Sequence, residues 1–219
     1  HHESVRRAGD LTEEHAFMAH LRARGLPIPA VLAALDGRSA IALGEWVYEV
    51  HAPADGTDIY RDTMSWVSPT EPAHAWQAGT MLACLHEAAA DYPAPQRGTH
   101  LLVAHSKLIE ASDPIATLAA HLSTRPALAA FLRERDWRGE LAAALVPFHA
   151  TVQARLAREP RCWTHGDWHV SNLCWSSAEP AAQITSVLDF GLAARNFALF
   201  DLATAIERNA IAWLQEGDD

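Results

Sequence analysis

Two short motifs carry most of the chemistry that this sequence offers. The first runs His-Gly-Asp and continues to an asparagine, giving the spacing Asp-x-x-x-x-Asn from Asp167 to Asn172. The second is Asp-Phe-Gly and begins at Asp189. Each follows a short apolar or β-branched run, residues 161–164 and 184–188, typical of a buried strand that delivers polar residues to a surface. The sequence therefore predicts two carboxylates and one carboxamide at the ends of strands.

These residue types suit the transfer of a phosphoryl group. That reaction needs a carboxylate that orients the attacking hydroxyl, and oxygen ligands that hold Mg²⁺ against the phosphates. Asp167 and Asn172 would lie on one loop, and Asp189 would bring a further ligand from the next strand. Each motif alone is a weak signal, but their order and spacing together predict a phosphoryl-transfer site.

In this order and spacing the motifs resemble those of the aminoglycoside phosphotransferase and choline kinase family, a branch of the protein-kinase-like superfamily. The residues that carry the resemblance are His165, Gly166, Asp167, Asn172, Asp189 and Asp201. The resemblance implies that Asp167 is the catalytic base or the hydroxyl-orienting residue, that Asn172 and Asp189 hold Mg²⁺, and that ATP or GTP is the phosphoryl donor. Gly166 stands where protein kinases use an arginine to receive an activation-loop phosphate, which implies a small-molecule kinase.

Other residues take supporting roles under the same resemblance. Asp201 would be a buried structural acid that braces the catalytic loop, and His165 would hydrogen-bond within that loop. His169 would be either a substrate-side residue or simply an exposed one. Arg195 could contact the transferred phosphate or the acceptor, and a salt bridge to a nearby acid is an equal alternative.

The resemblance also implies an α+β, two-lobed protein-kinase-like fold. We expect a partial small lobe with a mixed sheet over residues 1–50, a hinge over 51–57, and a mainly helical lobe over 58–219. A Gly-rich hairpin and a strand lysine are missing before Leu11, and the last predicted helix stops abruptly. We therefore expect both ends to be incomplete; the alternative is that the phosphate clamp is absent and the protein is not a competent kinase.

The N-terminal part predicts one helix and three strands. The helix should cover residues 11–24, with Thr12 as a candidate cap and Gly25 as its end. Asp36-Gly37 predicts a hairpin turn between the first two strands. The three strands are expected at residues 31–35, 40–43 and 46–50.

The resemblance places the nucleotide in this part of the chain. Glu14 fits best the helix acid that pairs with a strand lysine holding the ATP phosphates. A first-turn acid that interacts with the helix dipole explains Glu14 equally well. The nucleotide base would contact backbone groups near Glu49, Val50 and His51.

The remainder of the chain is predicted to be largely helical. Pro147 should kink or divide the third helix of the segment before the catalytic loop. The acids of that segment, among them Asp113 and Asp136, could meet ammonium groups or belong to solvated helix faces. The expected helices cover residues 73–90, 115–122, 126–133, 137–156 and 201–214.

Composition narrows the function classes. The chain has 219 residues, 49% of them hydrophobic, so it can bury a sizeable core. Its formal net charge of −10 argues against a nucleic-acid partner and would favour a cationic substrate. Three cysteines are too few for a disulfide framework and indicate a reducing cytoplasm. No apolar run approaches the ~20 residues of a membrane helix, and no feature indicates the oligomeric state.

The expected acceptor is a hydroxyl of a small molecule, an aminoglycoside-like or other antibiotic, with a role in resistance or self-protection. An amino alcohol, homoserine or a sugar is the alternative. A catalytically silent kinase-like binding module also stays open, whereas a Ser/Thr protein kinase is disfavoured because no Ala-Pro-Glu follows Asp-Phe-Gly. A zinc site is a further alternative, although it would leave the two acidic motifs unexplained. Its ligands would be Cys162, His165, His169 and Cys174.

Overall fold

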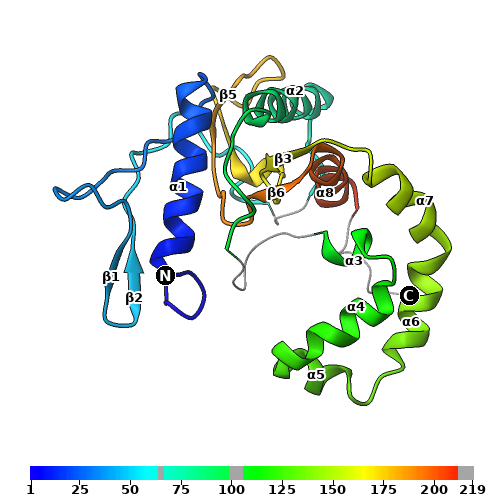
Figure 1. Cartoon of the computed structure of the whole chain (residues 1–219). Helices are drawn as coiled ribbons and strands as arrows, with labels where there is room; N and C mark the ends of the chain where they lie inside the picture. Colours follow the sequence, from blue (N-terminus) through cyan, green and yellow to red (C-terminus); the bar gives the residue numbers. More distant parts are fainter. Residues whose placement is uncertain (64–66, 99–105, 212–219) are drawn as a thin grey trace. The chain divides into compact units, whose positions relative to one another are not determined.

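The chain has an α+β fold, as predicted, that combines helices with short antiparallel strands (Figure 1). The computed structural model describes residues 1–63, 67–98 and 106–211. Two compact units are formed, one from His1–Ala104 with Arg161–Asp219 and the other from His105–Pro160. Both acidic motifs lie in the first unit. The lobe boundaries expected at residues 50 and 57 remain predictions.

The first unit contains three described strand pairs, all antiparallel: β1 with β2, β3 with β6, and β4 with β5. Because β3 leads into the Asp167 loop and β6 follows the Asp-Phe-Gly turn, their pairing draws the two motifs together. The elements in chain order are α1 (Ala8–Ala23), β1 (Ile41–Leu43), β2 (Trp46–Tyr48), α2 (Pro72–Ala89), β3 (Arg161–Thr164), the 3-10 turn η2 (Val170–Asn172), β4 (Leu173–Trp175), β5 (Ile184–Val187), β6 (Ala194–Phe197) and α8 (Ala198–Ala210).

Helix α1 begins three residues earlier than its sequence pattern predicted. The Asp10 carboxylate accepts a hydrogen bond from the backbone N–H of Arg7, which caps the helix ahead of Ala8. Thr12 is therefore not the cap; its hydroxyl donates to the carbonyl of Ala8 at 2.8 Å, inside the first turn. The predicted end is confirmed, since Gly25 follows with a φ of +86°, a left-handed conformation that glycine adopts readily.

One of the three predicted N-terminal strands is wrong. Of residues 31–35 only Val31 pairs, through an isolated bridge to His51, and Leu35 lies fully exposed. The turn at Asp36-Gly37 forms, but it does not join two strands. The hairpin instead links β1 to β2 through Gly44, whose φ is +63°. Beyond the Val31 bridge and the hydrogen bond from the Leu32 N–H to the Val50 carbonyl, the run has no ladder to join and stays a loop.

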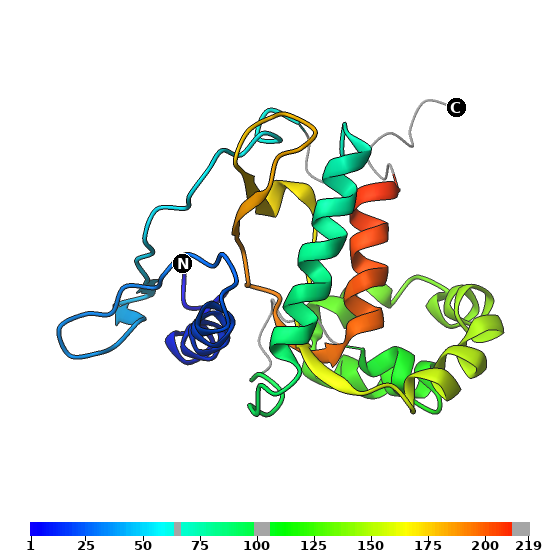
Figure 2. The same cartoon turned by 90° about the horizontal axis from the view of Figure 1, so that it is seen from above.

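Helices α2 and α8 lie side by side, as Figures 1 and 2 both show. The predicted helix over residues 73–90 is confirmed as α2. Helix α8 starts at Ala198, before the predicted position 201, and residues 212–214 of that prediction lie outside the described residues. The pair of helices matters for the site because each contributes a polar side chain to the support of the catalytic loop.

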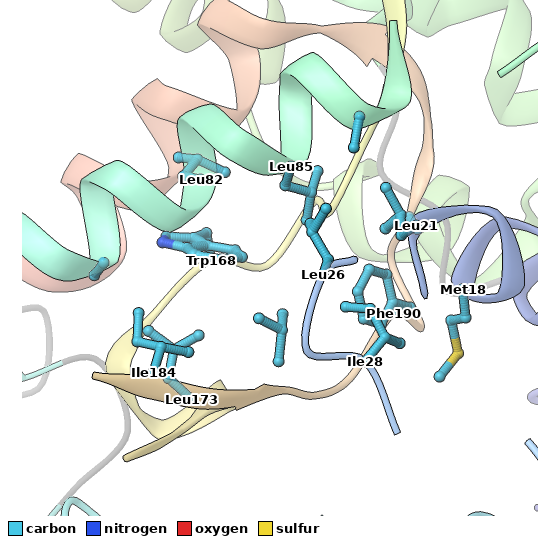
Figure 3. Close-up of a cluster of buried hydrophobic side chains, with 14 of the residues drawn as sticks. Met18, Leu21, Leu26, Ile28, Leu82, Leu85, Trp168, Leu173, Ile184 and Phe190 are labelled. Atoms are coloured by element: carbon cyan, nitrogen blue, oxygen red, sulfur yellow. The ribbon is translucent and has the colours of Figure 1, made fainter. Parts of the chain in front are cut away.

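The main hydrophobic core joins α1, α2, the catalytic loop and β4–β5 (Figure 3). Phe190 of the Asp-Phe-Gly turn packs in it beside Met18 and Ile28, and Trp168 of the catalytic loop packs below Leu82. Each large apolar side chain that is fully buried contributes about 1.5–3 kcal/mol of transfer free energy. Burying one residue from each motif therefore fixes the backbone on both sides of the site.

The second unit consists of short helices. Pro147 divides the predicted helix over residues 137–156, because α6 ends at Ala144 and α7 starts at Val146 with the proline in its first turn. Asp113 and Asp136 cap α4 and α6 through backbone N–H groups at 2.9 and 3.1 Å. Its elements are α3 (Lys107–Glu110), α4 (Pro114–His121), η1 (Leu122–Thr124), α5 (Pro126–Leu132), α6 (Trp137–Ala144) and α7 (Val146–Leu156).

No helix within residues 1–63, 67–98 and 106–211 combines the length and the apolar character needed to cross a membrane.

Candidate active site

The catalytic loop leaves β3 through a turn that only glycine can make. Gly166 has a φ of +84°, and a Cβ at this position would lie 2.5 Å from the carbonyl oxygen of Leu192. Any side chain would therefore both strain the backbone and collide with the chain after Asp-Phe-Gly. This close approach gives a local reason for the Gly in His-Gly-Asp, apart from the absence of a regulatory arginine.

Asp201 holds the backbone of this turn from α8. Its carboxylate is fully buried and accepts hydrogen bonds from the N–H groups of His165, at 2.9 Å, and Gly166, at 2.8 Å. His86 on α2 adds a third contact, 3.0 Å from its Nε2 to the carboxylate. A buried carboxylate requires such donors because an unpaired charge is very costly in the interior. His86 thus links α2 to the loop.

His165 connects the loop to the strand that leads to the second motif. Its ring is buried, Nε2 lies 2.8 Å from the carbonyl oxygen of Leu188, and Nδ1 accepts the N–H of Asp167 at 3.2 Å. One neutral tautomer satisfies both contacts, with the proton on Nε2. Because both nitrogens of His165 are used, the ring has no lone pair left for a metal, and the alternative zinc site is not formed.

Asn172 lies between the two acidic residues. Its side-chain amide donates to the carbonyl of Asp167 at 2.9 Å, and its own backbone carbonyl accepts the N–H of Leu188 at 2.9 Å. The second bond continues the β4–β5 ladder and sets Asn172 beside the start of Asp-Phe-Gly. The hydrogen bond to the Asp167 carbonyl orients the carboxamide, whose Oδ1 atom carries the lone pairs that can coordinate a cation.

Asp189 has a strained backbone. Its φ is +54°, the left-handed region, which among the described non-glycine residues occurs only here. The carboxylate accepts the N–H of Gly191 at 3.2 Å and lies 3.5 Å from the guanidinium of Arg6. With 53% of its side chain exposed, the carboxylate is accessible to an ion.

Asp167 lies between two basic side chains. Burial disfavours its charged form, but the His169 imidazole at 3.8 Å and the Arg208 guanidinium at 3.3 Å outweigh that effect and lower the pKa of Asp167 below its ordinary value. The expectation that His169 could be merely exposed is wrong, because its ring is buried against Asp167. Asp167 is therefore a carboxylate at neutral pH.

Two residues at the end of α8 support the site although no sequence motif marked them. Arg208 faces Asp167, and the Asn209 side chain accepts the N–H of Val170 at 3.2 Å and donates to the carbonyl of Trp168 at 3.1 Å. Asp201 and Asn209 are two helical repeats apart and so share one face of α8. That spacing of polar residues was the available signal that this face supports a loop.

Glu14 is paired with arginines in the described structure. It is buried and accepts a hydrogen bond from Arg97 at 2.9 Å, with Arg6 at 3.6 Å. Burial raises the pKa of Glu14, and the charges of Arg6 and Arg97 only partly offset this rise. Arg97, which sequence reasoning missed, also donates to the carbonyls of Gly191, at 2.9 Å, and Ala193, at 3.1 Å. A buried guanidinium therefore ties α1 to the Asp-Phe-Gly turn.

A cavity of about 390 Å³ brings together three predicted nucleotide-binding residues, Glu14, Glu49 and His51, and the predicted Mg²⁺ ligand Asp189. Arg6 also lines it. Val50 is not among the lining residues; its carbonyl accepts the N–H of Leu32 at 2.8 Å and its side chain is exposed. A cavity of this size, lined by charged and apolar side chains, can accept a small ligand next to Asp189.

Arg195 is located in β6, opposite Trp163. Its backbone N–H donates to the Gln96 side chain at 2.9 Å, and its carbonyl accepts from the same side chain at 3.0 Å. These bonds fix the strand after Asp-Phe-Gly. A contact of the Arg195 guanidinium with phosphate or acceptor stays a prediction.

Comparisons with known proteins identify the family and the fold. The model of the phosphotransferase enzyme family matches residues 1–218. An aminoglycoside phosphotransferase structure from Alicyclobacillus acidocaldarius subsp. acidocaldarius DSM 446 is similar, with a TM-score of 0.51 and 15% identity over 90% of this chain and 57% of that one. A microcompartment-associated aminopropanol kinase aligns with a TM-score of 0.49 and 19% identity over 90% of this chain and 58% of that one. Curated proteins gave no match. The chain thus spans less than two thirds of either structure.

Proposed function

This chain belongs to the phosphotransferase enzyme family, and from that premise we propose that it transfers the γ-phosphoryl group of ATP or GTP to a hydroxyl of a small molecule. The observation that carries the proposal is the braced catalytic loop, in which Asp201 holds the turn before Asp167 and Asn172 links Asp167 to the strand before Asp189. This arrangement supports one reaction centre built from both motifs.

In the proposed reaction Asp167 orients the acceptor hydroxyl in line with the γ-phosphate and accepts its proton late. The lowered pKa of Asp167 supports this role, because only the ionised form can accept a proton. Arg208 and His169 would keep the carboxylate ionised while the hydroxyl approaches. The loop contributes position and charge more than covalent chemistry.

Mg²⁺ would be held by Asn172 and Asp189. The Oδ1 atom of Asn172 and the half-exposed carboxylate of Asp189 are hard oxygen donors of the kind that this ion prefers. When bound with the nucleotide, Mg²⁺ would neutralise charge on the phosphates. Arg6, 3.5 Å from Asp189, would have to share that carboxylate or turn away when the ion binds.

The acceptor we propose is an aminoglycoside-like or other antibiotic, which would make the protein a resistance or self-protection enzyme. The net charge of −10 supports a polycationic acceptor through electrostatic attraction, and one similar fold belongs to an aminoglycoside phosphotransferase. An amino alcohol, homoserine or a sugar is the second candidate class.

Mass spectrometry of a mixed reaction tests the proposal. The purified protein is incubated with Mg²⁺, ATP or GTP, and a panel of aminoglycosides, other hydroxylated antibiotics, amino alcohols, homoserine and sugars. We expect a phosphate adduct on one class of compound. Nucleotide binding without any adduct would favour a silent binding module, and failure to bind nucleotide would contradict the proposal.

A further inference from the structure

A cluster of histidines surrounds one carboxylate between α1 and the segment after β2. The Nε2 atom of His15 lies 2.5 Å from Oε2 of Glu49, and the Nε2 atom of His51 lies 3.0 Å from the same oxygen. The imidazole of His1 approaches the other carboxylate oxygen at 2.6 Å. The donor atoms of His15, Glu49 and His51 all lie within 4.8 Å of one another.

We propose that His15, Glu49 and His51 form a binding site for a late first-row divalent cation of the zinc class. Two imidazoles and one carboxylate are a ligand set that Zn²⁺ accepts, with the fourth position left for water or another ligand. For bonds of about 2.0–2.1 Å in tetrahedral geometry, neighbouring ligand atoms lie roughly 3.3 Å apart. The two imidazole nitrogens lie 2.5 and 3.0 Å from the Glu49 oxygen, so each distance would have to increase by less than about 1 Å to admit the ion.

The environment of His15 prepares one nitrogen for coordination. Its ring is buried, and its Nδ1 lies 2.8 Å from the hydroxyl oxygen of Ser39. A hydrogen bond on one ring nitrogen fixes the orientation of a histidine ligand and leaves the other nitrogen for the ion. The rings of His15 and His51 meet edge to face with centroids 5.8 Å apart, which leaves both Nε2 atoms directed at Glu49.

An ion can reach this cluster from two sides. Glu49 and His51 line the cavity of about 390 Å³ that also contains Asp189, and His15 lines a second cavity of about 510 Å³ beside α1. The imidazole ligands distinguish the site from the oxygen ligands proposed for Mg²⁺. His15 belongs to α1, and the other two ligands follow β2. A bound ion would therefore cross-link these elements beside the cavity that contains Asp189.

Isothermal titration calorimetry with ZnCl₂, on chelator-treated protein without nucleotide, tests the site. We expect one saturable site, and a loss of affinity of at least about 10-fold in His51→Ala, whose half-exposed ring can be removed with little effect on folding. Ser39→Ala should weaken binding by about 10- to 100-fold through the orientation of His15. His20→Ala, on the same helix with its ring on the carbonyl of Ala88, should leave affinity unchanged.

Visible absorption of Co²⁺ in the same proteins provides a second readout, because low-coordinate Co²⁺ absorbs far more strongly than the hydrated ion. Thermal unfolding followed by circular dichroism establishes that each variant is folded. Absence of saturable Zn²⁺ binding, or equal affinity in the wild type, His51→Ala and Glu49→Gln, would overturn the proposal and leave a purely hydrogen-bonded cluster. Omitting nucleotide keeps this outcome independent of the phosphotransferase proposal.

Discussion

Asp167 has to remain ionised while it is half-withdrawn from water, and its neighbours explain how. Arg208 lies 3.3 Å and His169 3.8 Å from its carboxylate oxygens. Burial opposes ionisation, and the His169 imidazole together with the Arg208 guanidinium reverses that effect, so the pKa of Asp167 falls below the ordinary 3.8. A lowered pKa means that the carboxylate persists as the pH falls and is lost only below the ordinary aspartate range.

The lowered pKa of Asp167 predicts the pH profile of activity. We expect kcat/KM to show no acid limb from Asp167 above about pH 4, since its pKa is lowered from 3.8. Arg208→Gln removes one cation, so the pKa should rise and an acid limb should move to higher pH. Arg24→Gln, which removes a surface arginine paired with Asp91, is the control and should leave the profile unchanged. An acid limb at the same pH in wild type and Arg208→Gln would refute this electrostatic role.

At the scale of elements, the site is held by partners that are distant in sequence. Helix α8 supplies Asp201 to the turn and Asn209 to the loop, and α1 reaches the Asp-Phe-Gly turn through Arg97. Ordering the side chains that make these contacts costs conformational entropy, which the burial of the hydrophobic core offsets. The rigid support of Asp167 is therefore a property of α8 and the strand pairs more than of the loop itself.

Sequence patterns predicted the elements that act locally and missed those that depend on partners. Strands β3 and β5, helix α2 and the break at Pro147 follow from local periodicity and proline geometry, and the structure confirms them. The strand over residues 31–35 was wrong because an apolar run does not specify whether a neighbour will pair with it. Arg97 and Asn209 were missed because their partners lie far away along the chain.

Asn209→Ala tests the support of the loop by α8. The variant loses hydrogen bonds to the backbone of Trp168 and Val170, so we expect about 1–3 kcal/mol lower stability. It should also lower kcat more than it changes nucleotide affinity, because Asp167 loses its fixed position. Thr204→Ala, whose hydroxyl bonds only the carbonyl of Phe200 in its own helix, is the matched control. Thermal unfolding measures the stability of both variants, and steady-state kinetics measures kcat. Equal effects of Asn209→Ala and Thr204→Ala on both quantities would contradict the supporting role of Asn209.

At the scale of the whole molecule, the motifs predict the family and the proposed reaction class, whereas they do not predict the acceptor. The roles proposed for Asp167, Asn172 and Asp189 are the same for any hydroxyl acceptor, so these residues carry no information about its identity. The fold shared with an aminoglycoside phosphotransferase at 15% identity likewise reports architecture. The net charge of −10 is the one global property that bears on the acceptor, and it favours a cation.

The central claim is that Asp167 acts in phosphoryl transfer on a loop braced for that purpose. The most direct measurement compares the rate of γ-phosphoryl transfer and the nucleotide affinity of wild type, Asp167→Asn and the control Asp36→Asn, a surface residue paired with Arg38. The account predicts that Asp167→Asn keeps nucleotide affinity and lowers kcat by roughly 10²- to 10⁴-fold, while Asp36→Asn changes neither. A transfer rate in Asp167→Asn equal to that of the wild type would contradict it.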